Sequence, residues 1–341
     1  MVKVDFYSDT VTRPTPAMRR AMAEAEVGDE QQREDPTVNL LQDMVAELLG
    51  KEAALFLPSG TMCNQVAFAV HCRPGDEILL QEQAHPLLFE VGGPAAMVGA
   101  VLRPLVGPRG LFTADQVRQA VRPPAYYMPR TRAVSIEQTS NVIGGICWPI
   151  EQIEAVCSAA HDAGLVAHMD GARMMNVVVA SRTPADRFAA AFDSLWLDLS
   201  KGLGAPVGAV LAGSREFIEE AWRYKQRFGG AMRQAGIIAA AGVYALKHHV
   251  DRLAQDHERA RQLAQELAGI PGIQLDPGTV ETNIVVFEVA DAPALIAALA
   301  DAGVRMGALG PTTVRAVTHL DVGADDVAQA VEAVRTALAA R

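Results

Sequence analysis

The chain has 341 residues, 50% of them hydrophobic, so it can bury a large core and is long enough for two domains. Its formal net charge of −10 and the lack of a Lys/Arg run argue against nucleic acid as a partner, although a small anionic ligand stays compatible with it. There is no apolar run long enough to span a bilayer and no apolar signal-peptide core at the start, so we expect a cytoplasmic protein without a membrane partner.

The cysteine content predicts a reduced protein without a metal site. The four cysteines show none of the paired spacings that zinc sites use: they are Cys63, Cys72, Cys147 and Cys157. In a chain of this length such residues are typical core thiols of a cytosolic protein.

Short apolar runs alternate with longer helical patterns from residue 38 to about residue 250. Five of the runs look like buried strands: 53–57, 77–80, 133–136, 166–169 and 194–197. This alternation is typical of an α/β fold with a mostly parallel central sheet flanked by helices on both faces. Functional side chains of such sheets gather at the carboxyl ends of the strands, so we expect them directly after these runs.

The pattern changes in the last third of the chain. A helical stretch over 237–267 leads to predicted strands and helices: strands at 283–287 and 314–317, and helices at 293–302 and 324–340. We therefore expect an N-terminal arm and a large domain in residues 1–250, and a smaller C-terminal α+β domain in residues 251–341.

The segment 57–62 passes from the end of a predicted strand into a predicted helix. Free N–H groups at a helix N-terminus bind phosphate, and the hydroxyls of Ser59 and Thr61 beside Gly60 would add donors. The alternative is that Ser59 or Thr61 merely caps the helix, and for this motif taken alone the cap is favoured.

Asp170 and Lys201 each follow a predicted strand, so we expect them at the same edge of the sheet. A carboxylate can keep a pyridine nitrogen protonated and a lysine can form a Schiff base, which are the two groups that pyridoxal phosphate requires. Ser200 adds a hydroxyl next to Lys201. Taken singly, each residue has an ordinary structural explanation, but their order along the strand ends favours a cofactor site. His85 is either a ring that stacks on the cofactor or a structural histidine.

These residues belong to longer segments that resemble the threonine aldolases, within the β-eliminating lyase group of fold-type-I pyridoxal-phosphate enzymes. The resemblance covers nearly the whole chain and rests on segments 8–14, 34–39, 85–93, 170–173, 200–208, 232–236 and 315–321. It implies the fold-type-I fold with a smaller C-terminal α+β domain, an amino-acid substrate, and a tetramer made of two dimers whose active sites are shared between subunits.

The resemblance also implies a role for the residues that carry the cofactor ring. Lys201 would hold pyridoxal phosphate as a Schiff base, and Asp170 would pair with the ring nitrogen. Arg173 would hold the ring hydroxyl and contribute to substrate binding, while His85 would stack on the ring face.

Further residues are implied to bind the phosphate and the substrate. Gly60 and Thr61 would hold the phosphate, helped by Arg233 across a subunit interface, and Ser59 and Ser200 would complete the cofactor site. The substrate carboxylate would be held by Ser8 and Arg315, because a guanidinium can grip a carboxylate with two parallel hydrogen bonds.

Two positions depart from the family pattern. Gln32 stands where the family usually has a tyrosine, and Ser140 stands where it usually has a histidine beside the β-hydroxyl of the substrate. Serine can hydrogen-bond but cannot act as a base near neutral pH, so the base could be a water positioned by Ser140 and His85. We count Ser140 among the catalytic candidates with Lys201, His85 and Asp170. We expect a roomier, more polar pocket, unless a water merely replaces the imidazole.

The predicted reaction is retro-aldol cleavage of a β-hydroxy-α-amino acid, resembling threonine or allo-threonine or a bulkier or more polar analogue, to glycine and an aldehyde. Alternatives with the same cofactor are β-elimination and transaldolation on a related hydroxy-amino acid. A catalytically silent cofactor-binding protein is a rival of another class, which the presence of Lys201, Asp170 and Arg315 disfavours. The aldehyde and the stereochemistry at Cβ stay open.

Overall fold

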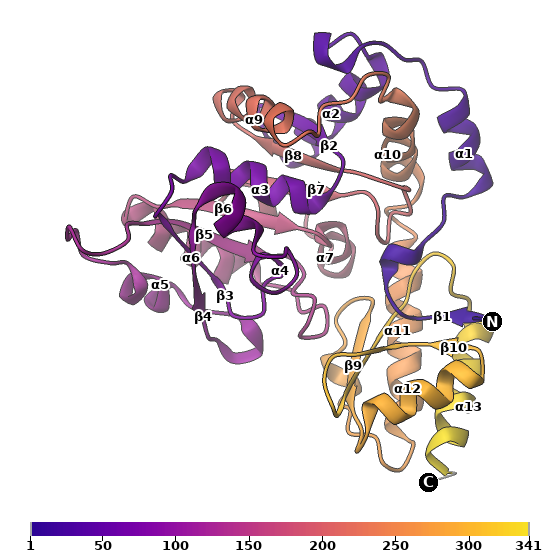
Figure 1. Ribbon diagram of the computed structural model, residues 1–341. Coiled ribbons are helices and arrows are strands. Elements are labelled where there is room, and N and C mark those ends of the chain that lie inside the picture. The colour runs from indigo at the N-terminus through magenta and orange to yellow at the C-terminus, as the bar shows by residue number, and fades with distance from the viewer. Residues whose placement is uncertain (1, 340–341) are drawn as a thin grey trace.

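A seven-stranded sheet forms the centre of the larger part of the molecule (Figure 1). The computed structural model describes residues 2–339. In spatial order the strands are β2 (Ala53–Leu57), β8 (Ala209–Gly213), β7 (Ser194–Asp198), β6 (Val166–Gly171), β5 (Thr131–Glu137), β3 (Glu77–Gln81) and β4 (Val101–Leu105). β8 runs antiparallel to both of its neighbours, and the four other pairings are parallel. The predicted mostly parallel sheet is confirmed.

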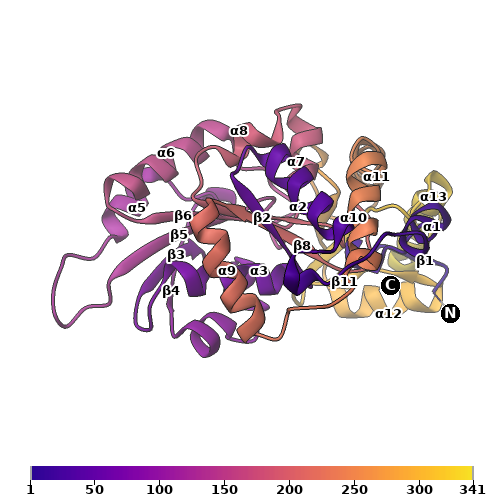
Figure 2. The same cartoon turned by 90° about the horizontal axis from the view of Figure 1, so that it is seen from above.

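Helices cover both faces of this sheet, as Figure 2 shows from above. One face carries α2 (Pro36–Leu49), α5 (Ala114–Ala120), α6 (Ile150–Asp162), α7 (Met174–Ser181), α8 (Ala185–Ala189) and α10 (Gly236–His248), and the other carries α3 (Gly60–His71) and α9 (Arg215–Arg227). Successive strand residues point to opposite faces of the sheet. Phe56 therefore packs in the hydrophobic core under the first group of helices, and Leu55 packs in the core under α3 and α9. This double burial explains why the strands read as continuous apolar runs.

The motif at residues 34–39 forms the start of helix α2. Asp35 caps α2, because its carboxylate accepts from the backbone N–H groups of Thr37 at 3.1 Å and Val38 at 3.0 Å, and Pro36 occupies the first turn. Gly50 ends the helix with φ of +60°, a left-handed conformation that glycine adopts without strain. The local sequence therefore specifies both ends of this helix.

The C-terminal part has its own sheet and core. Its antiparallel sheet has the order β11 (Gly307–Ala308), β12 (Thr313–Val317) and β9 (Ile284–Glu288), and its helices are α11 (Leu253–Ala268), α12 (Ala292–Asp301) and α13 (Ala324–Ala339). The predicted strands and helices of this region are found here, although residue 340 lies outside the described residues. The helical stretch predicted over 237–267 consists of two helices, α10 and α11.

The N-terminal arm crosses from one part to the other. β1 (Val4–Asp5) pairs in parallel with β10 (Val304–Arg305), and Phe6 is fully buried in the C-terminal core (Figure 1). The chain then runs to α1 (Pro16–Ala23), which packs against α10. The first residues therefore belong structurally with the C-terminal core, and the division at residue 250 stays a prediction. Within residues 2–339, no helix combines the length and the apolar character that crossing a bilayer requires.

Candidate active site

A cavity of about 360 Å³ opens at the carboxyl ends of β5, β6 and β7. The N-terminal arm, the short helix α4 (His85–Leu88) and the C-terminal sheet complete its wall. The side chains around it include those of Tyr7, Ser8, His85, Phe89, Glu137, Asn141, Arg173, Lys201, Leu309 and Arg315. The position is the one expected for a site in a sheet of this type. Among residues 2–339, no group of three or more His, Cys, Asp or Glu side chains is arranged to hold a metal ion.

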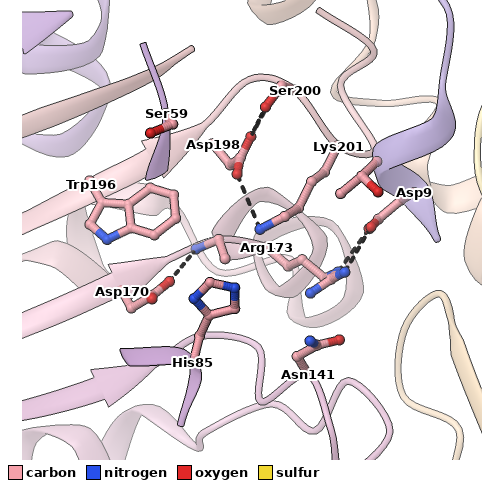
Figure 3. A network of polar contacts seen from close by, with 12 residues as sticks. Asp9, Ser59, His85, Asn141, Asp170, Arg173, Trp196, Asp198, Ser200 and Lys201 are labelled. Atoms are coloured by element: carbon pink, nitrogen blue, oxygen red, sulfur yellow. Dashed lines mark hydrogen bonds and ion pairs between the residues drawn. The ribbon is translucent and has the colours of Figure 1, made fainter. Parts of the chain in front are cut away.

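Lys201 lies in the cavity wall just after β7, where Asp198 faces it. Nζ of Lys201 is 3.1 Å from Oδ2 of Asp198, and both side chains are largely buried (Figure 3). The other oxygen of Asp198 accepts from the backbone N–H of Ser200 at 2.6 Å and from its hydroxyl at 2.9 Å. The Ser200 hydroxyl therefore holds a carboxylate that the sequence reasoning missed. Its signal was an acidic residue at a strand end, three positions before the lysine.

Asp170 is buried beside the cavity. Its carboxylate accepts from Nδ2 of Asn64 at 2.8 Å and from the backbone N–H of Ala172 at 3.1 Å. Burial, and next the charge of Glu137, raise its pKa to about 7, against the opposing effect of Lys201, Asn64 and His85. A carboxylate in this environment ionises readily only if a cationic partner reaches it.

The two arginines of the cavity differ in how their charge is balanced. Arg173 donates from Nε and Nη2 to the two oxygens of Asp9 at 2.8 and 2.7 Å, with both side chains buried. Burial alone would raise the pKa of Asp9, but Arg173 outweighs it and holds that pKa well below its usual range. Within the described residues 2–339, the acceptors of Arg315 are neutral: Oδ1 of Asn141 at 2.9 Å and the carbonyl of Tyr7 at 3.2 Å. Its buried Nε has no hydrogen-bond partner within residues 2–339.

His85 and Ser8 lie where the sequence predicted them, on the cavity wall. Nδ1 of His85 is 2.9 Å from Oε1 of the buried Glu90, and its backbone N–H donates to Glu137 at 3.0 Å. The Ser8 hydroxyl accepts from the backbone N–H and the hydroxyl of Thr10 at 3.2 and 2.9 Å. Glu90, Glu137 and Asn64 were not assigned a role from the sequence, because nothing local marks them as neighbours of His85 or Asp170.

Ser140 does not line the cavity, and its role beside the substrate stays a prediction. It is buried, pairs with Ile146 in an isolated bridge, and its hydroxyl donates to the carbonyl of Glu137 at 3.4 Å. Asn141, the next residue, begins a turn and lines the cavity.

Three further predicted regions lie outside the cavity wall of this chain. Gln32 is exposed at the end of a short 3-10 helix, Glu30–Gln32. Arg233 is also exposed and pairs with Asp29 at 3.0 Å.

Ser59 caps α3, because its hydroxyl accepts from the backbone N–H of Met62 at 3.2 Å. The helix-cap alternative for this motif is therefore correct, and a phosphate role is compatible with it.

Position 60 requires glycine because its backbone lies against the ring of Trp196. A Cβ at this position would lie 2.3 Å from the indole ring of Trp196, so the backbone can approach that ring only with glycine here. Thr61 is exposed beside it at the helix start. The start of α3 is therefore packed closely against β7, the strand that leads to Lys201.

Comparisons with known proteins agree with this architecture. The family model described as beta-eliminating lyase matches residues 5–291. The low specificity L-threonine aldolase of Escherichia coli K12 is 41% identical over 331 residues, 96% of each chain, and the probable low-specificity L-threonine aldolase 2 of Arabidopsis thaliana is 40% identical, covering 95% of this chain and 94% of the plant protein.

Solved structures show the same fold. A structure described as a putative L-allo-threonine aldolase of Listeria monocytogenes superposes with a TM-score of 0.82 at 20% identity, covering 98% of this chain and 96% of the other. The threonine aldolase of Leishmania major gives 0.83 at 19% identity, covering 98% and 99%. The extent of the family match and the identity to the bacterial and plant proteins show that this chain belongs to the β-eliminating lyase family, as a member of its threonine aldolase branch of pyridoxal-phosphate-dependent lyases.

Proposed function

We propose that the protein cleaves a β-hydroxy-α-amino acid to glycine and an aldehyde, with pyridoxal phosphate held on Lys201. The observation that carries the proposal is the meeting of Lys201, His85 and Arg315 around one cavity, although they come from three separate segments of the chain. An amine for the cofactor and a cation for the substrate carboxylate are the two groups that this reaction needs.

The residues present fit the cofactor. The buried Asp170 has donors on both oxygens and, among residues 2–339, no cation in contact, so a protonated ring nitrogen would supply the missing charge. His85 would lie against the ring, and Arg173, oriented by Asp9, would reach the ring hydroxyl. Ser59, Gly60 and Thr61 at the start of α3 would hold the phosphate, and Ser200 would act in the cofactor site by orienting Asp198 beside Lys201. When bound, the cofactor withdraws electrons from Cα of the amino acid, which weakens the Cα–Cβ bond.

Arg315 and Ser8 would bind the substrate carboxylate. Arg315 brings a positive charge with no carboxylate of its own and an unpaired buried Nε, so an anion in the cavity would complete its hydrogen bonds. Arg173 would serve substrate binding less directly, because Asp9 already neutralises it.

We propose that substrates larger than threonine are favoured. Because Ser140 lies outside the cavity wall, this proposal now depends on other residues. Phe89 is half-exposed at the cavity and Leu309 lies on the wall, so an aromatic or aliphatic side chain on Cβ would find apolar contacts. Such contact contributes about 1–3 kcal/mol to discrimination.

The test is to load the purified protein with pyridoxal phosphate and to measure glycine, aldehyde, 2-oxo acid and ammonia. The substrates are L-threonine, L-allo-threonine, phenylserine and 3-hydroxyaspartate. We expect glycine and aldehyde, with phenylserine cleaved faster than threonine. Production of 2-oxo acid and ammonia instead would show β-elimination and overturn the proposal, whereas threonine as the best substrate by about tenfold would refute only the size preference.

Lys201→Ala tests the attachment point. We expect the variant to lose both the turnover and the borohydride-reducible link to the cofactor, because no other cavity residue in the described part of the chain offers an amine. The matched control is Lys247→Ala, which removes an exposed lysine of α10 and should keep both. A reducible link that persists at another lysine in Lys201→Ala would show that the assignment is wrong.

A further inference from the structure

Glu90 is a buried carboxylate at the centre of a hydrogen-bond network next to the cavity. Its side chain is completely buried, and Oε1 is 2.9 Å from Nδ1 of His85 and 2.8 Å from Nδ2 of Asn64. Oε2 accepts from the amide of Gln65. A carboxylate so surrounded by donors has one fixed orientation, so it also fixes its partners.

The orientation of Asn64 follows from a neighbour that can only donate. The indole Nε1–H of Trp196 donates to Oδ1 of Asn64 at 2.7 Å, so the amide nitrogen must face the other way. There it donates to both Glu90 and Asp170, at 2.8 Å each. Glu90 and Asp170 are thus held by the same amide group, and both act as acceptors.

The network decides which nitrogen of His85 carries a proton. Because Glu90 accepts at Nδ1, that nitrogen is protonated, and Nε2 is the position at which the ring gains or loses its second proton. Within residues 2–339, Nε2 has no hydrogen-bond partner.

The charges around His85 also set its proton affinity. Burial alone lowers the pKa of His85, but the hydrogen bond to Glu90 and the charges of Asp170, Glu90 and Glu137 outweigh it and raise that pKa above its ordinary value. The cations that line the same cavity are Lys201, Arg173 and Arg315.

We propose that Glu90 is a positioning residue that makes His85 the acid–base group of the cleavage. The proposal rests on the proposed function. In the cleavage direction Nε2 of His85 takes the proton of the β-hydroxyl, the O–H electron pair forms the C=O bond of the aldehyde, and the Cα–Cβ pair stays with Cα. A proton from solvent added at Cα then completes glycine, and the proton on Nε2 returns to solvent, so that the protons balance and no oxidant or reductant is needed.

Glu90→Gln tests this role with little change of shape. The new amide can keep accepting from Asn64 and His85 while its NH2 group faces Gln65, whose buried Oε1 has no partner in the described chain and can turn to accept. The matched control is Glu82→Gln, which removes a carboxylate from the same loop at an exposed position.

Two measurements on the cofactor-loaded protein decide the matter. Exchange of the histidine C2 hydrogen, followed by mass spectrometry, reports the pKa of His85 without any turnover. We expect Glu90→Gln to lower that pKa, because the charge that stabilises the imidazolium is gone. The acidic limb of the kcat profile should move to lower pH in parallel, and the plateau of kcat should fall about tenfold with KM little changed, because the base becomes weaker. Glu82→Gln should match the wild type in all of these.

The outcomes separate the two proposals. An unchanged His85 pKa together with an unshifted kcat profile in Glu90→Gln would overturn the role of Glu90 while cleavage itself stands. Lower thermal stability with both pH curves unchanged would likewise reduce Glu90 to a packing residue. If the wild-type protein cleaves no β-hydroxy-amino acid, the proposed function fails, whereas a lowered His85 pKa would still support Glu90 as the residue that places the proton.

Discussion

At the scale of single residues, the two arginines of the cavity show why charge balance predicts a role better than position does. Both guanidinium groups lie on the same wall, yet Arg173 already forms two hydrogen bonds with Asp9. Arg315 has only neutral acceptors, and burial is the main cause that lowers its pKa. An unbalanced buried cation is costly in the free protein, so it gains most from an anionic ligand.

Replacing Arg315 with lysine should therefore weaken substrate binding. Lysine keeps the charge but cannot offer two parallel hydrogen bonds, so we expect KM to rise about 10- to 100-fold, the equivalent of one charge-assisted hydrogen bond. The absorbance of the bound cofactor should not change. Arg305→Lys is the control, since Arg305 is an exposed arginine of β10 paired with Asp5 at 3.3 Å. Equal KM values for the wild type and Arg315→Lys on every substrate would exclude this role.

At the scale of elements, the five strands predicted in residues 53–197 are all present, because runs buried on both faces are apolar throughout. Two strands of the sheet were missed. β4 contains Arg103 and Pro104 and lies at the sheet edge, where side chains are only half-covered, so its sequence lacks an apolar run. β8 follows directly on the glycine-rich turn after Lys201, which hid its start.

The position of Asn141 in the cavity could not be predicted from the local sequence. The family resemblance drew attention to position 140, whereas it is the next residue, Asn141, in the turn after the bridge between Ser140 and Ile146, that lines the cavity. Contacts of this kind depend on the fold of the loop and are absent from local sequence patterns.

A buried ion pair fastens the loop that contains Gln32 to α9. Nζ of Lys225 is 2.7 Å from Oε1 of Glu30, both side chains are fully buried, and Lys225 also donates to the carbonyl of Phe56 at 2.7 Å. Glu30 in turn accepts from the backbone N–H of Met232 at 2.9 Å. The pair therefore connects Glu30, and through it the backbone of Met232 next to Arg233, with α9 and with β2.

Breaking this pair should destabilise the protein strongly. Glu30→Gln leaves the buried Lys225 without a counter-charge, at a cost of about 3–5 kcal/mol in the free energy of unfolding. Lys225→Met should cost a similar amount, and the double variant should cost less than the sum by at least about 1 kcal/mol, because no lone charge remains. Urea unfolding at pH 7 measures all three. Glu219→Gln, which breaks the exposed pair with Arg33, should change stability by less than about 1 kcal/mol. Losses that small for the buried pair would contradict the argument.

At the scale of the whole molecule, the site exists only because distant segments fold together. Ser8 reaches the cavity since β1 pairs with β10, and Arg315 reaches it from the C-terminal sheet. The local sequence pattern assigned Arg315 to a strand. Only the family resemblance predicted that Ser8 and Arg315 lie in the same site. Local periodicity contains no information about contacts between residues that are some 300 positions apart, as between the carbonyl of Tyr7 and Arg315.

Two residues with a predicted role do not line the cavity. Arg233 and Gln32 are exposed and lie outside the cavity wall of their own chain. The family resemblance implies that Arg233 binds the phosphate across a subunit interface, and its exposed side chain is accessible to a neighbouring subunit. We therefore propose a homo-oligomer, built as a tetramer from two dimers, in which each site combines Lys201 of one subunit with Arg233 of the next.

Subunit mixing tests this arrangement. Lys201→Ala and Arg233→Ala subunits, each nearly inactive alone, are co-expressed with different tags. In a mixed dimer one site loses both residues and the other regains both, so random pairing should restore about a quarter of the wild-type activity. Mixing Lys201→Ala with Asp170→Asn subunits is the control, because both residues belong to one chain's strand edge and no intact site can form. Activity of the first mixture no higher than the mean of its two parents would show that Arg233 serves no neighbouring site.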